Sequence, residues 1–153
     1  MIIRDGFRAA AMDVGAKLAL EKVADGIVQN QQAYNVNTAT TTATLTAANI
    51  TGGSAEVILN MTGTLGVGVA LTLPTVADLV RAIADAAVNQ TYRLRIWNGG
   101  AGAFAWTVTT NTGWTLTGTM TVAQNTYREF LVTLTSKTTA TLQSLGTVAV
   151  TAL

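Results

Sequence analysis

Apolar and polar residues alternate with a period of two along most of the chain after residue 56, and this pattern constrains the fold more than any other feature. One run places Val57, Leu59 and Met61 on one side, and another does the same with Tyr92, Leu94 and Ile96. Successive side chains of a strand point to opposite faces of a sheet, so each run predicts a strand with one buried face. The same parity predicts these further core residues: Val67, Val69, Leu71, Leu73, Phe104, Trp106, Val108, Trp114, Leu116, Met120, Val122, Phe130, Val132, Leu134, Ala140, Leu142 and Leu145, with a weaker terminal run at Val148 and Val150. About eight short strands separated by turn residues predict an all-β sandwich or barrel.

Composition points to the same class and to an unusual exterior. Threonine occupies 28 of the 153 positions and serine only three, while charged residues make up 11% of the chain, against about 25% in ordinary soluble domains. Threonine is β-branched and fits a pleated surface, so these residues are expected on the outer faces of strands. A free monomer usually covers itself with interspersed charges. We therefore expect partners to cover part of this surface.

The chain divides into residues 1–34, expected to form an N-terminal arm, and residues 35–153, expected to form the β-sandwich. The arm holds about half of the charged side chains and no threonine, and Phe7, Ala11, Val14 and Leu18 recur at helical spacing. Two interpretations of this stripe stay open: a surface helix packed on its own domain, or an arm that orders against a neighbouring subunit. The small, polar stretch from residue 35 to 48 is interpreted as a linker that enters the first strand.

One helix is expected between the strands, over residues 76–87. Thr75 is a suitable N-cap residue and Asp78 follows it three positions later, which is a variant of the capping box. Val76, Leu79, Val80 and Ile83 then form an apolar stripe. The helix is expected to cover one end or edge of the sandwich.

The residue inventory argues against catalysis. The chain has no cysteine and no histidine, so it offers neither a Ser-His-Asp triad nor a zinc site of the usual kind. After residue 33 the acids are Glu56, Asp78, Asp85 and Glu129, with no close cluster for calcium or glycoside hydrolysis. We expect no catalytic residues, no metal, no cofactor and no small-molecule substrate.

The charge and hydropathy patterns also argue against two classes of partner. The formal net charge of +1 gives no bulk attraction to nucleic acid. No apolar run approaches the ~20 residues of a membrane span, and charges near the N-terminus break any apolar segment of a secretion signal. Neither nucleic acid nor a membrane is expected as a partner.

All three tryptophans lie between Trp97 and Trp114, around the glycine-rich stretch 98–102. The glycines lack the strand-to-helix setting of a phosphate loop and are expected to turn a β-hairpin. Parity places Trp106 and Trp114 in the core but Trp97 on the outer side with Arg93 and Arg95. An outward tryptophan beside two arginines is typical of protein interfaces. The alternative is a tryptophan folded under the glycine-rich turn beside solvated arginines.

Three phrases within the stretch from Leu45 to Gly146 carry a resemblance to a known family. These are LTAANITG, LTLPTVADLVRAI, and the run from YRLRIWNGG through TVAQNTYREF to LVTLT. In wording and order they resemble capsid cement or decoration proteins of tailed bacteriophages. Residues 1–33 match no pattern of that family.

The resemblance implies a jelly-roll-like β-sandwich that binds the outside of the assembled capsid and clamps neighbouring major capsid subunits. It further implies a homodimer or homotrimer, made in the host cytoplasm and located on the virion, with no catalytic residues. Phe7, Val14, Leu18, Arg93, Arg95 and Trp97 are the expected partner-contacting residues. A carbohydrate- or receptor-binding sandwich of a head fibre or tail is the alternative, with Trp97, Tyr92 or Tyr127 stacking on sugar.

Overall fold

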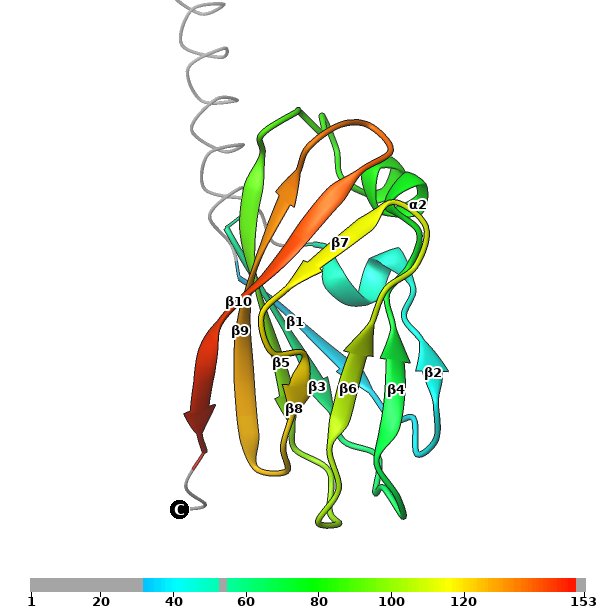
Figure 1. Cartoon of the computed structure of the whole chain (residues 1–153), viewed down its shortest axis with the longest axis vertical. Helices are drawn as coiled ribbons and strands as arrows, with labels where there is room; N and C mark the ends of the chain where they lie inside the picture. The colour runs from blue at the N-terminus through cyan, green and yellow to red at the C-terminus, as the bar shows by residue number, and fades with distance from the viewer. Residues whose placement is uncertain (1–31, 53–54, 151–153) are drawn as a thin grey trace, which may run out of the picture.

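The computed structural model describes residues 32–52 and 55–150, and these residues form an all-β sandwich with one short inserted α-helix (Figure 1). Two sheets pack face to face, one of six strands in the order β1-β3-β5-β9-β10-β7 and one of four in the order β2-β4-β6-β8. The strands are β1 Gln32–Asn37, β2 Ala43–Thr44, β3 Glu56–Met61, β4 Val69–Thr72, β5 Thr91–Asn98, β6 Trp106–Thr109, β7 Trp114–Thr117, β8 Thr121–Val122, β9 Thr126–Leu134 and β10 Ala140–Ala149. The expected sandwich is confirmed, and the described residues hold ten strands where the sequence predicted about eight.

The chain changes sheet at every step from β1 to β9, and this alternation determines the strand pairing. Because the chain crosses to the opposite sheet before it returns, β1, β3 and β5 pair in parallel, as do β2, β4 and β6. Parallel neighbours need such a crossover connection. Antiparallel pairs join β5 to β9, β9 to β10 and β6 to β8. The pairing is thus mixed, whereas a jelly roll is built from antiparallel strands.

The two inner faces supply one continuous core. Its largest fully buried side chains are Trp106 and Phe130, and Val57, Leu59, Met61, Tyr92, Leu94 and Ile96 are buried as the parity predicted. Trp114 is also buried, and its Nε1 donates a 2.7 Å hydrogen bond to the carbonyl of Pro74. Both tryptophans predicted for the core are therefore confirmed.

Four expected core residues are instead exposed, because the parity was extended past the ends of strands or across a bulge. Val67 precedes β4 and Phe104 precedes β6, and their side chains are 62% and 41% exposed. Leu145 lies at a bulge between Ser144 and Gly146, where the pairing of β10 with β9 shifts. Beyond the bulge Val148 belongs to the outer face, and it is 44% exposed. An inserted residue reverses the side of the sheet to which all later residues point.

The inserted helix α2, Val76–Ala82, begins as predicted and ends five residues earlier. Thr75 Oγ1 accepts a hydrogen bond from the Asp78 backbone N–H at 3.1 Å and donates one to the Asp78 carboxylate at 2.7 Å. Ile83 already has an extended backbone, and Asp85 has a left-handed φ of 54°. The helix covers one end of the sandwich (Figure 1), beside the 3-10 helix η1, Ala47–Ile50.

Three residues that the sequence assigned to the arm, Gln32, Ala33 and Tyr34, belong to a strand of the sandwich. Gln32 to Tyr34 are in β1, which pairs along its whole length with β3. The stretch interpreted as a linker contains the end of β1, the short strand β2 and η1. Asn35 connects these elements, because its side-chain amide donates to the carbonyls of Ala48, Asn49 and Thr51. The strand β1 has too few apolar residues to show the apolar–polar alternation that predicted the other strands.

The expected hairpin at residues 98–102 is wrong, because β5 and β6 belong to different sheets. The glycines there serve close packing between loops. A Cβ on Gly100 would collide with the carbonyl oxygen of Gly63, and a Cβ on Gly63 would collide with that of Ala39. Gly102 has a φ of 106°, a conformation that side chains with a Cβ rarely adopt. The glycine-rich stretch is thus a crossover between sheets.

Candidate interaction surface

The outer face of the six-stranded sheet carries the residues that the sequence singled out, arranged in three rows across the strands. The pairing register defines them, and each runs from β1 through β3, β5 and β9 to β10. The Trp97 row contains Val36, Asn60, Trp97, Tyr127 and Val148; the Arg95 row contains Tyr34, Ile58, Arg95, Glu129 and Gly146; the Arg93 row contains Gln32, Glu56, Arg93, Leu131 and Gln143.

Arg95 is the electrostatic centre of this face. Its Nε donates a 2.7 Å hydrogen bond to Glu129 Oε1 and lies 2.8 Å from Glu56 Oε1. The N–H points at Glu129, so the contact with Glu56 is an ion pair without a hydrogen bond, and Glu56 Oε1 accepts none within the described residues. Glu56 Oε2 accepts a 2.7 Å hydrogen bond from the side-chain amide of Gln32. The three charged side chains are 21% to 28% exposed.

This arrangement holds Arg95 in place. Burial alone would lower the pKa of its guanidinium, but the hydrogen bond to Glu129 and the charges of Glu56 and Glu129 raise that pKa above its ordinary value. The guanidinium carbon also lies 5.5 Å from the centre of the Tyr127 ring, within the range of a cation–π contact. Arg95 therefore contacts both adjacent rows, through Glu56 in the Arg93 row and Tyr127 in the Trp97 row.

Trp97 lies on the outer face, as its parity predicted, and it also packs under the glycine-rich crossover. A Cβ on Gly99 would lie 3.2 Å from Trp97 Cε2, so the indole lies directly beneath that residue. The indole is consequently half-buried, and its Nε1 is hidden from solvent without a hydrogen-bond partner in the described part of the chain. Trp97 therefore lies on the outer face, as one interpretation predicts, and also beneath the glycine-rich segment, as the other predicts.

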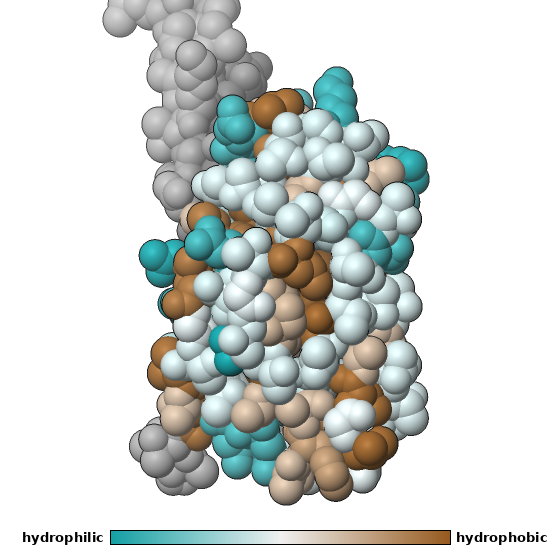
Figure 2. Space-filling view, in the orientation of Figure 1, coloured by the Kyte–Doolittle hydropathy of each residue, from teal (hydrophilic) through white to brown (hydrophobic). Residues whose placement is uncertain are grey.

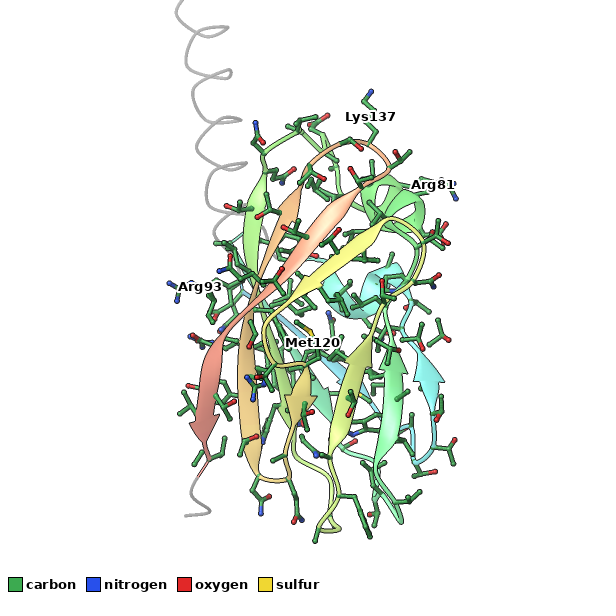
Figure 3. All side chains as sticks on the ribbon, viewed as in Figure 1. Arg81, Arg93, Met120 and Lys137 are labelled. Carbon is green, nitrogen blue, oxygen red and sulfur yellow. The ribbon has the colours of Figure 1, made fainter. Side chains whose placement is uncertain are left out.

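The apolar side chains at the two ends of the Trp97 row, and Tyr34 in the adjacent row, are strongly exposed. Val36 and Tyr34 are 52% and 56% exposed on β1, and Val148 is exposed on β10. Tyr34 leans toward the Trp97 row, because its hydroxyl accepts a 2.8 Å hydrogen bond from the Asn60 side chain. Arg93 is exposed, forms no ion pair within the described residues, and points away from the sheet (Figure 3).

The other sheet presents a different outer surface. Its outward strand positions are Thr44, Ala70, Thr72, Thr107, Thr109 and Thr121. Thr72 and Thr109 share a 3.0 Å hydrogen bond between their hydroxyls. Figure 2 shows a face of the molecule covered mainly by weakly polar residues, with hydrophilic residues in small separate groups. The expected neutral, threonine-rich exterior is present there.

The structure brings three of the expected contact residues onto one face, together with neighbours that the sequence did not single out. Arg93, Arg95 and Trp97 share one face, whereas Phe7, Val14 and Leu18 lie outside the described residues. The missed members are Tyr34, Ile58, Glu56 and Glu129. The parity of Glu56 and Glu129 did place them on outer faces, but only the strand register brings both to Arg95.

A hollow on the same face is open to solvent. It measures about 490 Å³ and is lined by Ala55, Glu56, Thr91, Tyr92, Arg93, Arg95 and Leu131. Enzyme and cofactor sites usually enclose most of their ligand, and this hollow does not. Tyr92 faces the core, where burial raises the pKa of its hydroxyl. Among the described residues, no three histidine, cysteine, aspartate or glutamate side chains gather in a group that could hold a metal ion.

No α-helix within residues 32–52 and 55–150 has the length and apolar character to cross a membrane. Comparisons with protein-family models, with curated proteins and with solved structures found no match for this chain.

Proposed function

We propose that this protein is a structural component of a virion that binds the outside of an assembled phage capsid and clamps neighbouring major capsid subunits. The observation that carries the proposal is the outer face of the six-stranded sheet, where the exposed side chains of Tyr34, Val36 and Val148 lie around the half-buried Trp97 and Arg95. Exposed aromatic and aliphatic side chains beside an arginine are typical of protein interfaces. The resemblance to decoration proteins is the reason for proposing the major capsid protein as the partner.

The proposed action is mechanical. A protein that binds the assembled lattice more tightly than dispersed subunits stabilises the lattice by mass action. The described residues support such a role with rigid elements: a continuous core, and a charged cluster that fixes the outer side chains of three adjacent strands. Homo-oligomerisation at a symmetry axis would multiply the contacts and increase the avidity. We propose no catalytic step, cofactor or small-molecule substrate.

Sedimentation with capsid shells tests the proposal. The full-length protein is mixed with shells of the phage that carries this chain, and the pellet is measured before and after shell expansion. We expect saturable binding to expanded shells and a higher temperature of shell disruption. Absence of the protein from both pellets, with an unchanged disruption temperature, would rule the proposal out.

A pair of matched variants connects that binding to the outer face. Val36→Lys introduces a charge into the Trp97 row, while Val67→Lys makes the same change in a loop where valine is similarly exposed. We expect Val36→Lys to reduce binding about tenfold and Val67→Lys to leave it unchanged. Equal effects of the two variants would dissociate capsid binding from this face.

Glycan binding is the second candidate, because Trp97, Tyr127 and Tyr34 share the outer face with Glu56 and Glu129. Sugar sites commonly combine aromatic faces with polar hydrogen-bonding groups. However, both carboxylates are engaged by Arg95 and Gln32, and Tyr92 is buried. These contacts favour a protein partner.

Fluorescence titration separates the two candidates. Trp106 and Trp114 are buried, so an oligosaccharide bound on the outer face would change chiefly the emission of Trp97. We expect no change with soluble oligosaccharides of bacterial cell surfaces. A saturable change that disappears in Trp97→Ala would favour the glycan-binding function instead.

A further inference from the structure

We propose that residues 1–31 of a neighbouring copy of this chain dock on the outer face of the six-stranded sheet, over the Trp97 row. This inference concerns how copies join one another and does not rest on capsid binding. It commits to one occupant, which is a named segment of the same protein. The neighbouring copy supplies the arm, and this copy supplies the sheet.

The dimensions of the row and of the arm's apolar stripe agree. Five neighbouring strands at about 4.8 Å spacing make the Trp97 row about 19 Å long. The stripe Phe7, Ala11, Val14 and Leu18 covers eleven residue steps, which amounts to about 17 Å at the rise of an α-helix. The two ends of the row, Val36 and Val148, are exposed, and an apolar helical stripe of this length would reach from one to the other.

The charges beside the row favour a narrow occupant over a second sheet. Arg93, Arg95, Glu56 and Glu129 lie in the two adjacent rows. A second copy packed sheet against sheet would bury these four charges against its own four, and the loss of hydration would oppose association. A helix about 10 Å wide covers the Trp97 row and its border. It leaves Arg93 in solvent, where the structure has it.

The direction of β1 favours an arm from another copy. The chain enters β1 at Gln32, in the Arg93 row, and reaches Val36, in the Trp97 row, four residues later. The described chain thus begins at the side of the sheet farthest from the Trp97 row. An arm that covered its own row would have to run against the direction in which the chain enters β1. A neighbouring copy needs no such reversal.

Cysteine cross-linking tests the proposal on the full-length protein, because the chain has no cysteine of its own. One chain carries Val14→Cys and a differently tagged chain carries Val36→Cys. The two are mixed without capsid shells and oxidised, and disulfide-linked pairs are separated by size. We expect the mixed pair to form at least about ten times more than when the second chain carries Val67→Cys. A second pair, Leu18→Cys with Val148→Cys, probes the other end of the row.

Each other occupant gives a different product and overturns the proposal. Cross-linking chiefly between two Val36→Cys chains would show that copies pack face to face. Cross-linking only within a single chain that carries both cysteines would show that the arm covers its own sheet. Cross-linking no greater than with Val67→Cys would show that no arm docks there. Cooperative thermal unfolding of each variant, like that of the wild type, establishes that the products come from folded protein.

Both proposals use the Trp97 row, but their tests have separate readouts. Docking of the arm without binding to shells would uphold this inference and remove the capsid proposal. Binding to shells without the mixed cross-link would do the reverse.

Discussion

The outer faces of the two sheets differ although they cover the same core. On the six-stranded sheet, three adjacent strands contribute Glu56, Arg95 and Glu129 to one ion-pair network, with Trp97 and Tyr127 beside it. The outward strand positions of the four-stranded sheet carry threonine and alanine alone. A sheet needs only β-branched or small polar residues to remain stable and soluble on its outer side. The threonine face meets that need, so the charged and aromatic face has residues that folding alone does not require.

A partner is therefore expected on the outer face of the six-stranded sheet. Half-buried arginine and tryptophan side chains are the types that dominate binding energies at interfaces, and they are concentrated on one face. The four-stranded sheet lacks both types at its outward positions.

Trp97→Ala is expected to have the largest effect on association. Removal of the central aromatic side chain of the row should weaken self-association or shell binding by about 2 kcal/mol, which is roughly thirtyfold. The half-buried indole should contribute less to folding, about 1 to 2 kcal/mol, whereas Trp106→Ala in the core should lower the unfolding free energy by about 3 to 5 kcal/mol. Light scattering and urea denaturation measure the two quantities. A large loss of unfolding free energy with intact association would make Trp97 a core residue.

Arg95→Leu is expected to destabilise the domain by about 1 to 2 kcal/mol. The variant leaves the carboxylates of Glu56 and Glu129 on either side of an apolar residue without their shared cation, a partly buried and unfavourable arrangement. Adding Glu56→Gln and Glu129→Gln should recover part of the loss, because it removes the uncompensated charges. Urea denaturation measures all three proteins. If the triple variant is no more stable than Arg95→Leu, the ion pairs contribute little and packing against Tyr127 explains the effect.

A lysine introduced on the outer face of the six-stranded sheet should weaken association by about 1 kcal/mol more than a lysine introduced on the outer face of the four-stranded sheet. Val148→Lys adds a cation to the end of the Trp97 row, and Thr121→Lys adds one to the exposed outer side of β8. Both positions are on the surface, so unfolding free energies should stay within about 0.5 kcal/mol of the wild type. Analytical ultracentrifugation should show weaker association for Val148→Lys alone. Weaker association for Thr121→Lys alone would move the interface to the four-stranded sheet.

Much of the fold could be predicted from the sequence because its physical determinants are local. Alternation predicted the strands that carry Val57 to Met61 and Tyr92 to Ile96, and the Thr75–Asp78 pair predicted the start of α2. The exposure of Leu145 could not be predicted, since a bulge reverses the parity after Ser144. The crossover at Gly100 was mistaken for a hairpin, because the sequence does not show which sheet receives the next strand.

The sequence could predict which residues of each strand face outward, but it could not predict which strands bring these residues together in the candidate site. Parity placed Arg93, Arg95 and Trp97 together on the outer side of β5, because alternation alone decides that question. It also placed Glu56 and Glu129 outward. Their meeting at Arg95 depends on the parallel register of β3 with β5 and the antiparallel register of β9 with β5. Register is a property of pairing between distant segments, and one strand's sequence does not contain it.

The smallest expected effect belongs to the hydrogen bond between Thr72 and Thr109 on the four-stranded sheet. Thr72→Val should leave the Thr109 hydroxyl without this partner and lower the unfolding free energy by about 0.5 kcal/mol. The double variant Thr72→Val with Thr109→Val should be closer to the wild type, because both hydroxyls are then replaced by methyl groups of similar shape. Association should be unchanged in both variants, since the bond lies on the face without aromatic or charged residues. A loss of association in the double variant would mean that the threonine face takes part in assembly.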